Sequence, residues 1–385
     1  MSDTAFIQKQ MLVWARTRAG LDIASAAKNV TTREKWETWE AGEALPSFRQ
    51  ALELARRLHI PFGYLFLTDP PDERLPLPDL RTKQSAGARP SPAFLDVIYD
   101  ALRKQEWYHD YLHEQDADPV AFVGRFTENA PVAAVAEDIA RTLRLDQSLR
   151  TQAGNTDDYF RLLVARVEAA GVVVLRSGIA GNNTHRPLDA DEFQGFAKPD
   201  GLAPLVFVNQ NDYLSAQVFT LFHELAHIWT GLAGVSDLDY LDQPADQSAI
   251  HQRRADQIAA EALVPARDFE ARWAIHPTAD RLDLLRKDYR VSIFVILRRA
   301  YDLNKLSFVE YRSKYDEYKR QIKTSKPSGG GGYSTLFSRN SRKVATAVLS
   351  SVIEGRLAPT EGATLLNVRP ATLYNMEHYM VMSGA

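Results

Sequence analysis

The sequence predicts an α+β protein that is mostly helical and contains a small β-sheet. Three observations indicate this class. Most of the chain consists of segments in which apolar residues recur at helical spacing. Three short runs rich in β-branched or aromatic residues, at 171–175, 193–197 and 205–209, are typical of strands. These runs precede an apolar helix at residues 219–229, so sheet and helix are expected to share one core.

Length and composition restrict the class of protein. A chain of 385 residues predicts two or three domains. Its 46 basic and 49 acidic residues nearly balance, so no global charge indicates a nucleic-acid or membrane-surface protein. The absence of cysteine excludes disulfides, cysteine-ligated zinc and thiol catalysis. No run is long enough to cross a bilayer and the start lacks a signal-peptide pattern, so a cytoplasmic protein without membrane contact is expected.

The first segment predicts four short helices, the first at residues 6–19 and the last at 48–58. The third passes through Trp36 and Trp39 and ends at Gly42. Together with the run at 39–46, this order resembles the Cro/C1-type (XRE) helix-turn-helix domain. The resemblance implies that residues 1–68 bind DNA, with the third helix in the major groove, and that the chain forms a homodimer through this domain.

The side chains expected to reach DNA lie on and just before the third helix: Thr32, Arg33, Lys35 and Thr38. Four glutamates, at 34, 37, 40 and 43, share the segment and repel phosphate. The alternative is therefore a helical domain used for dimerisation or for docking a partner.

A proline-rich stretch at residues 68–92 predicts a domain boundary, so residues 69–150 are expected to form a linker and a helical connector. His109 and His113 lie four apart on one of these helices. Because no acid lies at a useful spacing, we expect both to be solvated and not to bind a metal.

The helix at residues 219–229 carries the pattern H-E-x-x-H. Residues four apart share one face of a helix, so His223 and His227 can direct their imidazoles to one point, with Glu224 beside it. Two imidazoles and a carboxylate suit a Zn2+ ion and a polarised water. In such a site the histidines hold zinc and Glu224 is the catalytic base. The null hypothesis is that the two histidines lie four apart by chance.

Residues 193–265 resemble the ImmA/IrrE family of zinc metallopeptidases. The resemblance rests on Gly195-Phe196 with the strand at 204–209, on the motif helix, and on the run 259–265. It implies a zincin-like metallopeptidase core at residues 151–325. In that family the second helix supplies a glutamate as third ligand, and the residue four positions later orients the site.

The chain departs from the family pattern at these two positions, which here hold Gln252 and Asp256. A neutral amide is a poorer zinc ligand than a carboxylate, so activity depends on what completes the site. The third ligand is expected to be Gln252, His251 or Asp256, or an acid from the loop at 237–246. Asp256 is equally suited to accept a hydrogen bond from a zinc-bound imidazole, in the second shell.

After a glycine run, residues 326–385 are expected to form a flexible linker and a small helix-turn-helix-like tail. No acid occurs between Glu317 and Glu354, whereas seven basic residues do. This basic run either is solvated or contacts phosphate or an acidic partner.

Two functions follow from these interpretations. In the first, the chain is a DNA-binding regulatory zinc endopeptidase that cuts a protein substrate such as a transcriptional repressor. In the second, it is a non-catalytic DNA-binding regulator or antitoxin, which neutralises a partner toxin and keeps the peptidase fold as a scaffold. The two functions differ in the third metal ligand: if Gln252 occupies that position and no acid replaces it, the second function is favoured.

Overall fold

The computed structural model describes residues 4–73, 75–78, 90–236, 247–321 and 332–383. It confirms the expected class: helices predominate, and four strands form one small sheet in the described part of the chain. The chain divides into two compact units. The first comprises residues 1–75 and 90–95, and the second residues 76–89 and 96–385.

The first unit is helical, and three of its helices begin at a capping side chain. Asp22 accepts a hydrogen bond from the Ser25 amide at 2.7 Å, and Ser47 forms a capping box with Gln50. Trp36 and Trp39 are the largest side chains of its core. The elements are α1 (Lys9–Arg18), α2 (Ile23–Ala27), α3 (Arg33–Ala41), α4 (Phe48–Leu58) and the 3₁₀ helix η1 (Phe62–Phe66).

The second unit contains all four strands and the remaining helices. The strands are β1 (Val173–Ser177), β2 (Gly195–Lys198), β3 (Leu205–Asn209) and β4 (Gly234–Ser236). The helices up to the last strand are α6 (Pro92–Glu114), whose first residues belong to the first unit, α7 (Val132–Thr142), α8 (Gln147–Gln152), α9 (Thr156–Ala169) and α10 (Leu214–Thr230). The later helices are α11 (Gln247–Leu263), α12 (Ala266–Ile275), α13 (Arg281–Tyr289), α14 (Ile293–Asp302), α15 (Phe308–Gln321), α16 (Gly332–Asn340), α17 (Arg342–Ile353), α18 (Pro359–Leu365) and α19 (Pro370–Ser383).

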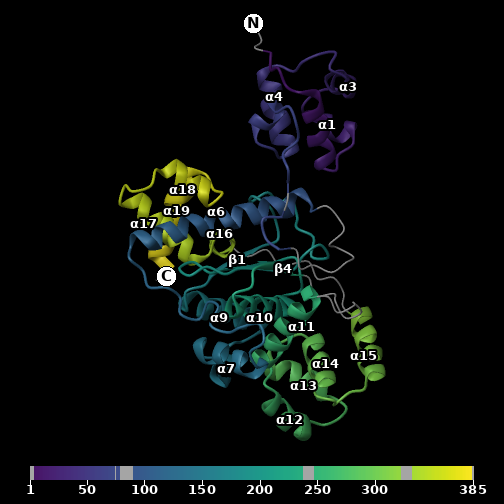
Figure 1. Cartoon of the computed structure of the whole chain (residues 1–385), viewed down its shortest axis with the longest axis vertical. Coiled ribbons are helices and arrows are strands. Elements are labelled where there is room, and N and C mark those ends of the chain that lie inside the picture. The colour runs from purple at the N-terminus through teal and green to yellow at the C-terminus, as the bar shows by residue number, and fades with distance from the viewer. Residues whose placement is uncertain (1–3, 74, 79–89, 237–246, 322–331, 384–385) are drawn as a thin grey trace. The chain divides into compact units, whose positions relative to one another are not determined.

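The sheet has the strand order β1-β3-β2-β4 and is mixed. Strand β1 pairs parallel to β3, whereas β2 pairs antiparallel to both β3 and β4. All five residues of β3 are buried, because helices cover both faces. Figure 1 shows α9 and α10 below the sheet and α6 and α16 above it. The helix that carries the H-E-x-x-H motif therefore packs against the central strands.

Strand β4 forms one edge of the sheet, and a residue of the proline-rich stretch lies against it. The backbone amide of Val235 donates to the carbonyl oxygen of Pro78 at 3.1 Å. Leu77, the residue before Pro78 in the sequence, is buried. The segment at 76–78 thus pairs locally with the edge strand.

Several boundaries differ from those expected. Strand β1 begins two residues later than the apolar run at 171–175, because Gly171 has a φ of 113° that a strand does not allow. Helix α16 begins at Gly332, inside the expected linker, and β4 was not expected. Three expected segments lie wholly or partly outside the described residues: 326–331 of the glycine linker, 74 and 79–89 of the proline-rich stretch at 68–92, and the acidic loop at 237–246.

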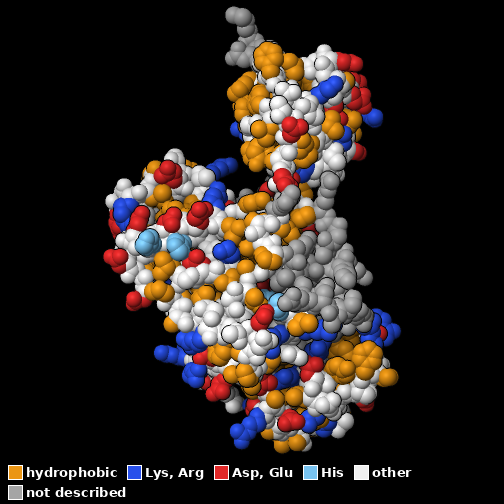
Figure 2. Space-filling model, viewed as in Figure 1, with side chains coloured by type: hydrophobic (Ala, Val, Ile, Leu, Met, Phe, Trp, Pro, Cys, Tyr) orange, Lys and Arg blue, Asp and Glu red, His pale blue; other side chains and the backbone are white. Residues whose placement is uncertain are grey.

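Within the described residues, none of the helices combines the length and apolar character that a membrane span requires. Figure 2 shows acidic and basic side chains interspersed on the visible face, as the near-neutral composition predicts.

Candidate functional site

Helix α10 brings the two motif histidines together inside the second unit. Their Nε2 atoms are 3.2 Å apart, and the side chains are 0% and 1% exposed. Helical spacing places both rings on one face, and the apolar residues around the motif bury that face. His223 and His227 therefore point their Nε2 atoms at one buried position.

Asp256 on α11 holds His223 in place. Its Oδ1 lies 2.7 Å from His223 Nδ1, which donates to it. Burial lowers the pKa of His223, but the Asp256 carboxylate outweighs this and the net shift is upward. With Nδ1 engaged as donor, Nε2 faces His227. Asp256 thus has the geometry of a group that orients an imidazole, and not of one that lies between the two rings.

Glu224 is fully buried, and neither carboxylate oxygen has a hydrogen-bond partner among the described residues. Burial raises its pKa to about 7, although nearby His223 and Ser236 oppose the rise. Gly195 on β2 makes room for this carboxylate, because a Cβ there would lie 2.9 Å from Glu224 Oε1. The site therefore contains an acid that can hold or release a proton near neutral pH.

Gln252 lies where the third ligand was expected. It is 2% exposed, and it lies near enough to His223 and His227 to act in the direction of a higher pKa for each imidazole. Its Nε2 approaches Ser236 Oγ at 3.4 Å, and its Oε1 has no partner among the described residues. One turn of α11 separates Gln252 from Asp256, so the helix presents both to α10.

The other candidates for the third ligand do not converge on the site. His251 Nε2 is paired with Glu128 Oε2 at 2.8 Å. Asp256 is engaged by His223 Nδ1, and the acids at 237–246 lie outside the described residues. Among the candidates that the structure describes, Gln252 alone lies near both imidazoles.

The distance between the two Nε2 atoms tests whether these residues fit a zinc ion. Two nitrogens bound tetrahedrally to one zinc at 2.0–2.1 Å lie about 3.3 Å apart, which agrees with the 3.2 Å seen here. A direct N–H···N bond would have a similar length, but it would leave the oxygens of Glu224 and Gln252 buried and unpaired. The donor set therefore fits a cation.

The fit is incomplete in one respect. In the described part of the chain, no three His, Cys, Asp or Glu side chains are placed to hold a metal. A third protein ligand from that part is the amide oxygen of Gln252, which binds zinc more weakly than a carboxylate does.

The residues expected to contact DNA lie on or next to α3, and each has a partner within the first unit. Thr32 caps the helix, accepting from the Lys35 amide at 3.3 Å, and Thr38 donates to the Lys35 carbonyl at 2.8 Å. Arg33 is paired with Glu37 at 2.9 Å, and the Lys35 ammonium lies 5.8 Å from the Trp39 ring centre. The basic side chains are exposed but partly neutralised.

Two residues beside the H-E-x-x-H motif were given no role in the site from the sequence. Gly195 could have been found, because a glycine inside a strand pattern often marks a close approach by another group. Ser236 lies in β4, which is too short to show a pattern. His109, expected to be solvated, is paired with Asp200 at 2.8 Å. The sequence does not indicate this pair, because the two residues are 91 positions apart.

Comparison with known families supports the resemblance of the central segment. Residues 167–301 match the Peptidase_M78 family model, described as an IrrE N-terminal-like domain. Residues 340–378 match a domain family of unknown function, DUF8813. Both segments lie in the second unit. No curated protein and no solved structure matches the chain.

Proposed function

We propose, from the IrrE-like match, that the chain is a DNA-binding regulatory zinc metallopeptidase that hydrolyses a peptide bond in a protein substrate such as a transcriptional repressor. One observation carries the proposal. The Nε2 atoms of His223 and His227 converge at 3.2 Å beside the unpaired carboxylate of Glu224, in a buried site.

The chemistry divides between the ion and the chain. When bound by His223 and His227, zinc supplies Lewis-acid polarisation of a water and of the scissile carbonyl. Asp256 fixes the tautomer of His223, so that Nε2 is the free ligand atom. Glu224 takes a proton at a carboxylate oxygen and later gives it to the leaving amine.

The first unit is proposed to bind DNA. Support comes from the exposed Arg33 and Lys35 on α3, and from the XRE-like sequence around that helix. We keep the proposed division into an XRE-type domain at 1–68, a connector at 69–150, a metallopeptidase domain at 151–325 and a helical tail at 326–385. A homodimer formed through residues 1–68 belongs to the same proposal.

Metal analysis of the purified full-length chain tests the zinc site. We expect about one zinc per chain, and loss of that zinc in His223→Ala, because a single imidazole with an amide holds zinc weakly. His276→Ala is the matched control, since His276 is paired with Asp288 and is outside the site. Zinc occupancy that survives His223→Ala would refute the metal site. Glu224→Gln should keep zinc and abolish cleavage.

A second function is favoured by one observation, the amide at position 252. If Gln252 leaves the site unable to hold zinc, the chain is a non-catalytic DNA-binding regulator or an antitoxin that neutralises a partner toxin by binding. Zinc-free purified protein that still binds DNA, and that binds no zinc on titration, would support this function against the first.

A further inference from the structure

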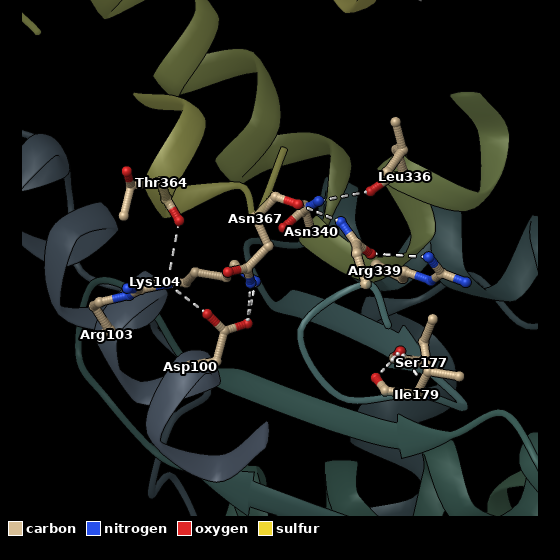
Figure 3. A network of polar contacts seen from close by, with 11 residues as sticks. Asp100, Arg103, Lys104, Ser177, Ile179, Leu336, Arg339, Asn340, Thr364 and Asn367 are labelled. Atoms are coloured by element: carbon tan, nitrogen blue, oxygen red, sulfur yellow. Dashed lines mark hydrogen bonds and ion pairs between the residues drawn. The ribbon is translucent and has the colours of Figure 1, made fainter. Parts of the chain in front are cut away.

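A pocket distinct from the histidine site lies on the other face of the sheet. Its floor consists of buried residues from α6, β1 and the end of α16, among them Lys104, Ser177 and Asn340. Its rim contains the partly exposed Asp100, Asn182 and Arg339, and Asn367 of the turn after α18. Figure 3 shows the polar network around it. The pocket therefore joins the IrrE-like segment to the DUF8813 segment.

The pocket has more positive than negative charge. Asp100 is the acid that lines it, and both its oxygens are already used. Oδ1 accepts from Arg103 at 2.6 Å, while Oδ2 accepts from Lys104 and, at 2.8 Å, from Asn367. Lys104 is 2% exposed, so two of its three N–H donors are buried without a partner among the described residues. Arg339 adds a second positive charge to the lining.

Arg339 has no acidic partner in the described structure. Its Nη1 donates to Asn182 Oδ1 at 2.8 Å, and its Nε is buried and unpaired. Burial lowers the pKa of Arg339, and no carboxylate is near enough to oppose this shift. The side formed by Nε and Nη2 is therefore free. That side of a guanidinium makes two parallel hydrogen bonds to an oxyanion.

Asn340 contributes an unpaired hydrogen-bond acceptor, whereas Arg339 contributes unpaired donors. Its Nδ2 donates to the Leu336 carbonyl at 3.0 Å, which fixes the amide, and its Oδ1 is buried without a partner. An oxyanion without a proton would leave this acceptor unsatisfied. A ligand that accepts hydrogen bonds from Arg339 and also donates one to Asn340 would satisfy both atoms.

We propose that this pocket binds a phosphate group that carries one proton, either as free phosphate or as a phosphate monoester. Two phosphate oxygens accept from Nε and Nη2 of Arg339, and the P–OH group donates to Asn340 Oδ1. Bound phosphate stabilises the attachment of the DUF8813 segment to the sheet, because Arg339 and Asn340 belong to the chain that leads into that segment.

Calorimetric titration of the full-length chain at about pH 6, close to the second pKa of a phosphate monoester, tests the proposal. The probes are inorganic phosphate, glycerol phosphate and sulfate. We expect phosphate to bind at least about tenfold more tightly than sulfate, because sulfate has the same shape and no proton to donate. Glycerol phosphate binding within a few-fold of phosphate identifies a monoester as the ligand, and its failure to bind identifies free phosphate.

Two variants separate the site from general charge effects. Arg339→Gln removes the guanidinium, and Asn182→Asp places a carboxylate on Arg339 Nη1 that competes with the ligand. Each should weaken phosphate binding at least about tenfold. Arg356→Gln is the matched control, since Arg356 is paired with Glu354 and does not line the pocket. Circular dichroism verifies that each variant is folded.

The proposal is wrong if phosphate gives no binding at millimolar concentration, if sulfate binds as tightly as phosphate, or if Arg339→Gln binds phosphate like the wild type. None of these results depends on zinc or on peptidase activity, so the pocket is tested independently of the proposed function.

Discussion

Helices α3 and α10 both carry the residues to which the sequence assigns function, yet the two helices present them differently. The four polar side chains at α3 are bonded within the protein, to the helix backbone, to Glu37 or to the Trp39 ring. On α10, the oxygens of Glu224 and Nδ1 of His227 are buried and have no partner in the described structure.

This difference gives unequal physical support to the proposed zinc site on α10 and to the proposed DNA binding by α3. Burying an unpaired polar group costs free energy, so such groups persist where a ligand or a reaction uses them. Exposed and paired charges carry no such requirement, because water and neighbouring side chains already satisfy them. The unpaired oxygens of Glu224 therefore favour a partner for the α10 site, whereas the four polar side chains at α3 are already satisfied. Four variants test this comparison.

The largest effect is expected at Gly195, which lies against α10. A Cβ there would meet Thr220 Cγ2 at 2.8 Å and both Glu224 Oε1 and the Phe207 carbonyl oxygen at 2.9 Å. The Phe207 carbonyl is fixed in the sheet, so Gly195→Ala should lower the free energy of unfolding by about 3 kcal/mol. Denaturant unfolding measures this. Gly201→Ala, with open space at its Cβ, should change it by less than about 0.5 kcal/mol.

The next effect concerns zinc affinity. Gln252→Glu places a carboxylate beside both imidazoles, so zinc affinity should rise about 10- to 100-fold, as measured by competition with a chelator. Gln210→Glu makes the same change of charge in the turn after β3 and should leave the affinity unchanged. An equal affinity in Gln252→Glu and wild type would show that position 252 does not face the metal.

Asp212, just before α10, offers a smaller test with a carboxylate that is paired at one oxygen. Its Oδ1 accepts from the Tyr213 amide at 2.7 Å, whereas its Oδ2 is buried and has no partner among the described residues. Burial raises its pKa to about 6, although the Tyr213 amide opposes the rise. Because the folded pKa exceeds the unfolded value, the protonated group stabilises the fold below about pH 4, and this contribution is lost as the pH rises through 6. Asp212→Asn should therefore stabilise the protein by about 1 kcal/mol at pH 7 and flatten this pH dependence.

The matched control for Asp212 is Asp22 of the first unit, which is exposed and accepts from the Ser25 amide. Asp22→Asn should give no gain at pH 7, because the side chain and the backbone amide of Ser25 lower the pKa of Asp22. Denaturant unfolding at a series of pH values compares the two. A gain in Asp22→Asn as large as that in Asp212→Asn would contradict the role of burial.

The smallest effect is expected on α3. Glu37→Gln releases Arg33 and removes a charge that repels phosphate, so affinity of the full chain for duplex DNA at low salt should rise about two- to five-fold. Fluorescence anisotropy measures this. Glu53→Gln removes an equivalent exposed charge from α4 and should have less effect. If no variant binds DNA at low salt, α3 serves protein contacts.

Elements with strong local signals were predictable. Helix α4 and strand β3 occupy the residues expected, because Ser47 and Gln50 cap the helix and a β-branched run forms the strand. Local signals failed where tertiary contacts decide. Asn211 and Asp212 are residue types that cap helices, but Tyr213 directly precedes α10, and the Asn211 amide donates to the carbonyls of Gly178 and Leu188.

The motif spacing predicts that His223 and His227 meet, but not what surrounds them. The sequence left Asp256 open as ligand or as orienting group, because that choice depends on how α11 packs against α10. The basic run indicated that Arg339 could contact phosphate. The sequence does not reveal the partner of Arg339, because that partner is Asn182, which is 157 residues away in the chain and is neutral.

The hydrogen bond between Val235 and Pro78 bears on how the chain behaves in concentrated solution. An exposed edge strand is a template onto which other chains can add, and this is a common route to aggregation. Here the Val235 amide already donates a hydrogen bond to the Pro78 carbonyl oxygen. Proline has no backbone N–H, so Pro78 cannot donate a hydrogen bond to a further strand. Within the described residues, the proline-rich stretch thus also covers one backbone amide of the edge strand.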